Sequence, residues 1–243
     1  MKILELNNIN KTFYTELGAL DVLKDVSFDV KKGEIVAIVG PSGSGKSTLL
    51  NIISGLIEPT SGQMQIDGDI GYMFQKDHLF NWRTVWKNLL IGLEIKKDKD
   101  VKKVEKVKGL LEKYGLIDFI YNYPQELSGG MRQRIALIRT LATNPNILLL
   151  DEPFSALDYQ TRINVSNDIY QMIKDEEVSA LLVTHDIGEA ISMADRVIVL
   201  SHRPANLKKI IEIKTSGINT PIEKRKSAEF SKYFDMIWGY LNE

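Results

Sequence analysis

The chain has no cysteine among its 243 residues, which excludes disulfide bonds and catalysis by a thiol. This composition fits a reducing compartment. A large net charge is also absent: the formal charge is −1, so no overall field attracts nucleic acid or an anionic membrane. No apolar run approaches the length of about 18 residues that a membrane helix needs, and residues 1–8 are too polar for a signal peptide. If the protein serves a membrane, we expect it to do so through a partner.

Residues 40–48 read GPSGSGKST, the complete pattern of a phosphate-binding loop (P-loop). Its glycines let backbone N–H groups turn toward phosphate oxygens, Lys46 can reach the β- and γ-phosphates, and the Ser47 hydroxyl can bind Mg²⁺. The apolar run 35–39 predicts a buried strand before the loop, and the residues after it predict a helix that begins near Gly45. A glycine-rich turn that binds nothing is the alternative, which these flanks disfavour. The predicted phosphate-binding residues are Gly40, Pro41, Ser42, Gly43, Ser44, Gly45, Lys46, Ser47 and Thr48.

The N-terminal third predicts an antiparallel sheet joined to a nucleotide-binding core. Residues 1–32 are rich in strand-forming patterns, and apolar residues partly alternate with polar ones between Val22 and Val30. Residues 62–66 predict a further strand. The Asp67-Gly68 pair that follows is typical of a β-hairpin turn.

Residues 77–135 predict a helical region. Between Val101 and Tyr114, apolar side chains recur at steps of three and four on a lysine-rich segment, which indicates an amphipathic helix. Acidic residues alternate with these lysines, so we expect a solvated helix face rather than a basic binding patch.

The remaining sequence returns to an α/β pattern. Short apolar runs at 147–150, 180–183 and 197–200 are separated by helix-length segments, which indicates parallel strands covered by helices. Residues 230–241 predict an amphipathic helix that docks on the core of its own domain, with a membrane-surface role as the alternative.

The predicted fold class is α/β: a P-loop NTPase core with a mostly parallel sheet, an N-terminal antiparallel β subdomain and an inserted helical subdomain. We expect one domain, 1–243. Within it, about 1–76 and 136–205 form the core with the β subdomain, about 77–135 form the helical subdomain, and about 206–243 form a C-terminal segment.

Two further motifs carry chemistry. Asp151 and Glu152 follow a buried apolar run, where Asp151 can hold the Mg²⁺ shell and Glu152 can orient a water for attack on the γ-phosphate. The alternative is that these adjacent acids only cap the N-terminus of a helix and have no catalytic role. Ser128-Gly129-Gly130 opens a helix and is a second anion site. One γ-phosphate does not need two complete cradles, but two half-sites facing each other across a dimer would use both.

The order of these motifs resembles the ATP-binding-cassette ATPases, the nucleotide-binding subunits of ABC transporters, from about residue 3 to 205. The resemblance implies that Gln75 contacts Mg²⁺ and the attacking water, and that His185 bonds the γ-phosphate. It implies that the segment ending at Asp158 crosses a dimer interface and that Phe13 stacks on adenine, with Tyr14 as the alternative. Taken singly, these residues are also compatible with a surface glutamine, a strand-end histidine and a core aromatic.

The same resemblance implies that two copies close head-to-tail over two molecules of Mg²⁺-ATP and drive a permease. The chain would then lie at the cytoplasmic face of the membrane, served by an extracytoplasmic solute-binding protein, with no nucleic acid partner. The Met131–Arg134 and Asp151–Asp158 segments resemble importers of nitrate, sulfonate or taurine, a group that also carries thiamine-pyrimidine precursors. The chain departs from that group between Ile66 and Gln75. A soluble ABC ATPase is the rival function, but such proteins usually carry a coiled-coil insertion or a second cassette.

Residues 78–85 follow Gln75 at the place where the family receives its permease. Phe80 and Trp82 would be costly apolar exposure on a lone subunit, but they would be useful anchors in an interface. The alternative is that they pack inside the helical region.

Overall fold

An antiparallel sheet at the N-terminus, sheet A, consists of β1 (Lys2–Thr15), β2 (Gly18–Lys31) and β4 (Ser61–Ile66) in the order β2-β1-β4. The computed structural model describes residues 1–16, 18–215, 217 and 220–242. Apolar side chains of β1 such as Leu4, Leu6 and Ile9 are fully buried, because they all face the core. The β-rich start predicted from the sequence is confirmed.

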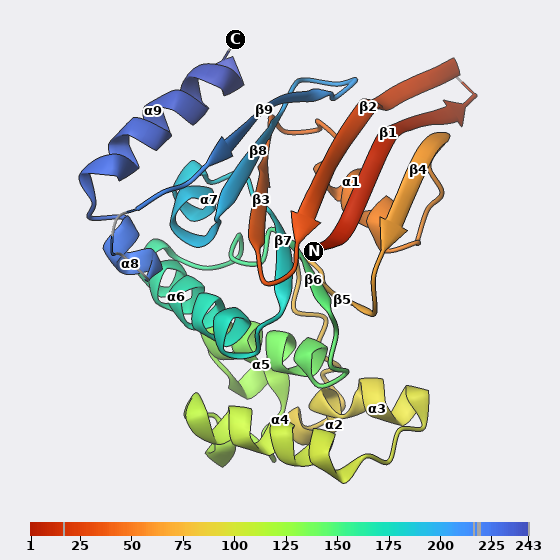
Figure 1. Ribbon diagram of the computed structural model, residues 1–243. Coiled ribbons are helices and arrows are strands. Elements are labelled where there is room, and N and C mark those ends of the chain that lie inside the picture. The colour runs from red at the N-terminus through yellow and green to blue at the C-terminus, as the bar shows by residue number, and fades with distance from the viewer. Residues whose placement is uncertain (17, 216, 218–219, 243) are drawn as a thin grey trace.

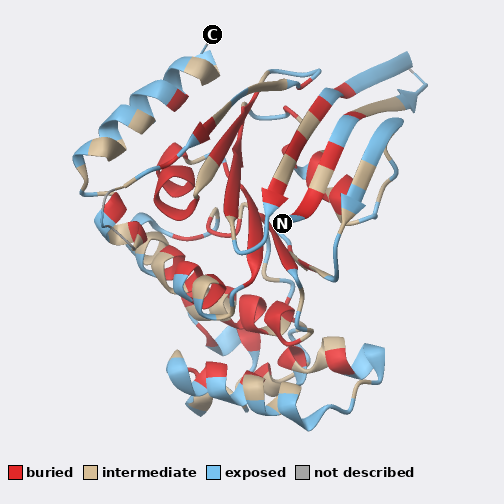
Figure 2. Ribbon diagram, in the orientation of Figure 1, coloured by how far each residue is buried: buried red, intermediate tan, exposed pale blue. Residues whose placement is uncertain are grey.

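The central sheet, sheet B, has the strand order β5-β6-β7-β3-β8-β9. All neighbouring pairs are parallel except β8 and β9. Every residue of β3, β6 and β7 is buried, as expected for aliphatic strands covered on both faces (Figure 2). The bounds are β3 (Ile35–Val39), β5 (Ile70–Met73), β6 (Ile147–Asp151), β7 (Ser179–Val183), β8 (Arg196–Leu200) and β9 (Leu207–Glu212).

The predicted hairpin at Asp67-Gly68 is wrong. The strand before it, β4, pairs with β1 in sheet A, and the strand after it, β5, pairs in parallel with β6 in sheet B. Gly68 has φ +101°, and a Cβ there would lie 2.2 Å from Asn146 Oδ1. The same amide oxygen accepts a hydrogen bond from the Asp69 N–H at 2.8 Å. Asn146 therefore holds a turn that passes the chain from one sheet to the other.

The helices fall into three groups (Figure 1). Those of the core are α1 (Lys46–Ile53), α6 (Tyr159–Asp175) and α7 (Ile187–Met193). Those between β5 and β6 are α2 (Val85–Leu89), α3 (Ile91–Lys96), α4 (Val101–Lys113), two short 3₁₀ turns (Ile117–Phe119 and Pro124–Glu126) and α5 (Gly129–Leu141). The C-terminal ones are α8 (Pro221–Lys224) and α9 (Ala228–Asn242). The amphipathic helix predicted over 101–114 is confirmed as α4, whose lysines are mostly exposed.

Sheet B separates two hydrophobic clusters, because successive side chains of a strand point to opposite faces. On β3, Ile35, Ala37 and Val39 join the cluster of α5, α6 and α7. Val36 and Ile38 join the cluster of α1 and sheet A. The result is a layered core from which the helices between β5 and β6 project at one end (Figure 1).

The predicted docking of the C-terminal helix is confirmed. Ile237 is fully buried, and Phe230 and Tyr233 pack against the same cluster as α7. Phe234 and Trp238 remain on the outer face of α9. Among the described residues, no helix combines the length and the apolar character needed to cross a membrane.

Candidate nucleotide-binding site

Three loops meet at one edge of sheet B, because they follow three adjacent parallel strands. The strands are β6, β7 and β3, in that order. The carboxyl ends of parallel strands lie at the same edge of a sheet, which is where ligands bind in open α/β folds. This topology places the P-loop beside Asp151-Glu152 and beside His185.

The P-loop has the backbone of an anion cradle. Gly43 and Gly45 have φ +73° and +96°, conformations that L-residues rarely adopt. A Cβ at Gly45 would lie 2.7 Å from Val22 Cγ1, so the close approach of β2 also requires glycine. Gly45 caps α1 without any side-chain hydrogen bond, which leaves the N-terminal amides of the helix available to a ligand.

Two side chains of the loop also fit an anion. Lys46 is 6% exposed, and its Nζ donates to the carbonyls of Gly40 and Pro41, at 2.9 Å each. Burial lowers the pKa of Lys46, and the nearby carboxylates of Glu152 and Asp151 oppose this effect. The buried Ser44 hydroxyl has no hydrogen-bond partner in the structure. A bound phosphate would satisfy this hydroxyl and the ammonium together.

Ser47 and Asp151 form a pair suited to magnesium. The Ser47 hydroxyl donates to Asp151 Oδ1 at 3.1 Å. Burial raises the pKa of Asp151, while the Ser47 hydrogen bond opposes this effect. Within the described residues, no cluster of three or more His, Cys, Asp and Glu side chains could hold a metal. A hydroxyl and one carboxylate suit Mg²⁺, which takes its other ligands from water and substrate phosphates.

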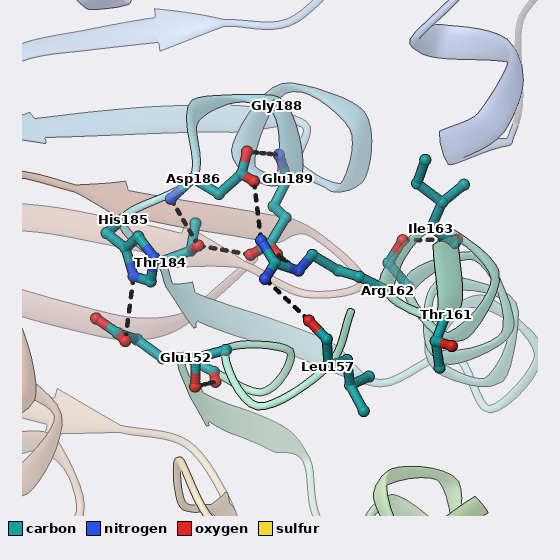
Figure 3. Close-up of polar contacts among 12 residues, drawn as sticks. Glu152, Leu157, Thr161, Arg162, Ile163, Thr184, His185, Asp186, Gly188 and Glu189 are labelled. Atoms are coloured by element: carbon teal, nitrogen blue, oxygen red, sulfur yellow. Dashed lines mark hydrogen bonds and ion pairs between the residues drawn. The ribbon is translucent and has the colours of Figure 1, made fainter. Parts of the chain in front are cut away.

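Glu152 lies at the centre of a polar group formed by three predicted residues. Its Oε2 accepts from Gln75 Nε2 at 3.2 Å. The same oxygen lies 3.2 Å from His185 Nδ1 (Figure 3). Gln75 also donates to the Ser155 hydroxyl at 3.4 Å. The backbone of Glu152 has φ +44°, and its N–H donates to the Val183 carbonyl at 2.8 Å. Such a strained backbone persists only where its surroundings fix it, so β7 holds this carboxylate in place.

Glu152 and His185 border a cavity of about 660 Å³ that Phe13 and Lys46 also line, whereas Gln75 and Asp151 are not among its lining residues. Tyr14, the alternative base-stacking residue, is 80% exposed and is not among the lining residues. Leu20, Val22 and Arg203 line the cavity as well, and the sequence analysis missed them. The hairpin register could have found Leu20, since it pairs directly with Phe13 across β1 and β2. Arg203 follows β8 in a loop without a recognisable motif.

The second predicted anion site lies elsewhere. Of the described residues, none of Ser128, Gly129, Gly130 and Asp158 lines the cavity. The Ser128 hydroxyl caps α5 by accepting from the Met131 N–H at 3.2 Å. Asp158 caps α6 by accepting from the Thr161 N–H at 3.0 Å, and this hydrogen bond lowers the pKa of Asp158. The structure therefore does not bring the two anion sites of one chain together.

The loop before α2 presents an exposed aromatic side chain. Trp82 is 75% exposed, and its ring lies 5.0 Å from that of the half-buried Phe80. The buried Asn88 holds this loop: its Nδ2 donates to the carbonyls of Phe80, Arg83 and Thr84, at 3.0–3.1 Å. Trp82 is therefore presented on a loop of fixed shape.

The chain matches known proteins over most of its length. Residues 23–155 match the family model described as ABC transporter. The nitrate import ATP-binding protein NrtD of Synechocystis is 39% identical, with 98% of this chain and 94% of the relative covered. The aliphatic sulfonates import ATP-binding protein SsuB of Bacillus cereus is 40% identical, with 92% and 89% covered.

A solved structure has the same fold. The structure is a dimeric, post-hydrolysis state of the ATP-binding cassette MJ0796 bound to ADP and Pi. It matches with a TM-score of 0.71 and 30% identity, covering 87% of this chain and 99% of the other.

Proposed function

Since the chain belongs to the ABC transporter family, we propose that it binds and hydrolyses ATP to power a permease that imports a small anion. One observation carries the proposal: Lys46, Glu152 and His185 line one cavity together with Phe13. The phosphate-binding loop, the carboxylate and the histidine thus face the space that a nucleoside triphosphate would fill. Nitrate and aliphatic sulfonates are the solutes that the relatives' names support.

Each residue has a distinct task in the proposed reaction. The P-loop amides and Lys46 would hold the phosphates, while Phe13 would stack on the base. Glu152 would orient and deprotonate the attacking water, and His185 would bond the γ-phosphate. Ser47 and Asp151, with Gln75 as a further proposed ligand, would hold Mg²⁺, which would neutralise charge on the phosphate oxygens. Catalysis by this set is mostly positioning and charge stabilisation.

A second copy of the chain would complete the site. Ser128, Gly129 and Gly130 lie outside the cavity of their own chain, and the MJ0796 cassette is dimeric. We propose a head-to-tail dimer in which the α5 start of one copy faces the P-loop of the other. Asp158 would lie at the interface between the two copies.

The permease would receive the loop that carries Trp82. An aromatic side chain 75% exposed on a fixed loop is typical of an interface anchor. The chain would then be held at the cytoplasmic face of the membrane by the permease, and a solute-binding protein would deliver the solute from the other side. Co-purification of the Trp82→Ala variant with its permease tests the contact. Undiminished permease binding and transport-coupled hydrolysis would contradict it.

The Glu152→Gln variant tests the catalytic assignment. The amide cannot take a proton from water, so we expect ATP hydrolysis to stop while an ATP-bound dimer accumulates. Phosphate release measures the first effect, and size-exclusion chromatography with ATP measures the second. Glu105→Gln, an exposed change on α4, is the matched control. Hydrolysis by Glu152→Gln at the parent rate would overturn the assignment.

The solute is tested on the intact transporter. The complex is purified from membranes, and hydrolysis is measured with its binding protein loaded with nitrate, an alkanesulfonate or taurine. We expect one of these anions to stimulate hydrolysis. Stimulation only by a thiamine-pyrimidine precursor would contradict the anion assignment and leave the ATPase assignment intact.

A further inference from the structure

Arg162, in the first turn of α6, joins two loops of the candidate site (Figure 3). Its Nη2 donates to the Leu157 carbonyl at 3.1 Å, in the segment proposed to meet the second copy. Its Nη1 donates to Asp186 Oδ2 at 3.4 Å, and its Nε lies 3.7 Å from Glu189 Oε1. One guanidinium therefore connects the end of the Ser155–Asp158 segment to the residues that follow β7.

The acids that Arg162 contacts fix the backbone around His185. Thr184 Oγ1 donates to Glu189 Oε2 at 2.6 Å and accepts from the Asp186 N–H at 3.0 Å. Asp186 Oδ1 accepts from the Glu189 N–H at 3.0 Å and so caps α7. Thr184 and Asp186 flank His185 in the sequence. The position of the His185 backbone thus depends on the two carboxylates that the arginine holds.

Arg162 also helps to balance the charge of a buried carboxylate. Glu189 is 3% exposed, and a buried carboxylate needs a cation or several hydrogen bonds. Burial raises the pKa of Glu189 and Asp186 adds to this effect, while the Thr184 hydroxyl, Arg162 and Arg225 oppose it. The buried Nε of Arg162 makes no hydrogen bond in the structure. A small shift of the guanidinium with Leu157 would bring this free donor onto Glu189.

We propose that Arg162 is a positioning residue that couples the place of the Leu157–Asp158 segment to the orientation of His185. This inference rests on the proposed roles of His185 and Asp158. Arg162 is not among the residues that line the nucleotide cavity. Its replacement should therefore slow hydrolysis without weakening nucleotide binding.

The first test is the Arg162→Lys variant of the full chain. Lysine keeps one positive charge near Glu189, but a point charge cannot donate to Leu157 and to both acids together. We expect kcat to fall about tenfold, since a small misplacement of a catalytic group is costly. KM and the binding of a fluorescent ATP analogue should stay within about twofold of the parent, because no cavity contact is lost.

Arg196→Lys is the matched control. Arg196 also holds a backbone carbonyl, that of Asp29, and two carboxylates, those of Glu34 and Asp29. It begins β8 and so lies at the amino edge of the parallel sheet, away from the site. We expect its melting temperature to fall while kcat stays unchanged. An equal loss of kcat in both variants would assign the effect to general destabilisation and overturn the proposal.

A double-mutant cycle with His185→Ala tests separately whether His185 is catalytic and whether Arg162 acts through it. If Arg162 acts through His185, then Arg162→Lys should change single-turnover hydrolysis less than about twofold in the His185→Ala background. A further tenfold loss there would overturn the coupling. Parent activity in Arg162→Lys alone would also overturn it, and His185 would keep its proposed role. Parent activity in His185→Ala would instead refute that role, and the coupling with it.

Discussion

The chain has two glycine-rich helix starts, and they are built differently. The helix α1 begins behind Gly45, has no side-chain cap and lies at the cavity. The helix α5 begins behind Ser128, whose own hydroxyl accepts from Met131, and its start lies outside the cavity. Neither helix has an acidic residue in its first turn. The start of α1 therefore has no side-chain partner within the loop, whereas that of α5 has one in the Ser128 hydroxyl. In the proposed dimer, the first would bind the phosphates of its own chain's nucleotide and the second would face those of the other copy.

The glycines of the two starts serve different physical needs. Gly45 is left-handed, so a side chain would strain its backbone. Gly129 and Gly130 are not left-handed, but a Cβ at either would lie 2.9 Å from a neighbouring carbon, of Leu157 and Val165 respectively. The first glycine shapes the loop proposed to hold phosphate, and the other two let α5 approach α6 and the Leu157 segment closely. Glycine at the start of a helix is thus required for two different structural reasons.

The largest expected effect is that of Lys46→Ala. Loss of the buried ammonium removes the cation that faces the phosphates, so we expect hydrolysis to fall more than about 100-fold and ATP binding to weaken. Phosphate release and equilibrium binding of ATP measure the two effects. Lys108→Ala, on the exposed face of α4, should change neither. If Lys46→Ala bound ATP as tightly as the parent, the proposal that the P-loop and the start of α1 bind the ATP phosphates would be refuted.

Ser128→Asp should separate the two helix starts. Aspartate keeps the N-cap of α5, so the fold is preserved, but its charge repels the phosphates of a facing copy. We expect ATP binding to the isolated chain to stay at the parent level and hydrolysis to fall by about tenfold or more. If ATP binding fell as in Lys46→Ala, both starts would act within one chain, contrary to the dimer proposal.

The elements that the sequence predicted well are those whose signals are local. The P-loop, the amphipathic α4 and the apolar central strands each follow from residue spacing alone. The convergence of Asp151, Glu152 and His185 follows from one further rule, that parallel strands end at the same edge.

The misjudged or missed elements depend on contacts between distant segments. Asp67-Gly68 has the local signal of a hairpin, but the Asn146 side chain captures the turn and sends β5 to the other sheet. Arg203 reaches the cavity from a loop whose path is set by β8 and sheet A, as the contact of Leu23 with Ala205 indicates. The network of Arg162 was likewise hidden, because its two acidic partners, Asp186 and Glu189, lie 24 or more residues away along the chain.

Phe13→Ala should weaken ATP binding at the P-loop cavity to a moderate degree. The ring lines the cavity, and a stacked base–aromatic contact contributes about 1–3 kcal/mol, so we expect ATP affinity to fall by about tenfold. The exposed neighbour gives a matched control, since Tyr14→Ala should leave the affinity within about twofold. Equilibrium binding of ATP to the two variants decides between them. A larger effect at Tyr14 would exchange the two assignments.

The smallest expected effect concerns how firmly the helices that accompany α5 are attached to the core. Asp175, at the end of α6, accepts from Lys113 Nζ at 2.6 Å and from the Tyr114 hydroxyl at 3.1 Å, at the end of α4. The Lys113 hydrogen bond holds the pKa of Asp175 below its usual value. Because the pair is partly exposed, we expect Asp175→Asn to lower the free energy of unfolding by only about 0.5 kcal/mol near pH 7.

The pH dependence of that difference gives the Asp175 test its sign. A carboxylate with a lowered folded-state pKa stabilises the fold above its unfolded pKa, and this contribution is lost as the pH falls through the folded pKa. The parent and Asp175→Asn should therefore converge in acid, below about pH 4. Urea unfolding near pH 7 and below about pH 4 measures the difference in unfolding free energy between the two proteins. Hydrogen exchange then shows whether α4 is the region that is destabilised. A gap that persisted in acid would mean that α4 is held there by packing rather than by charge.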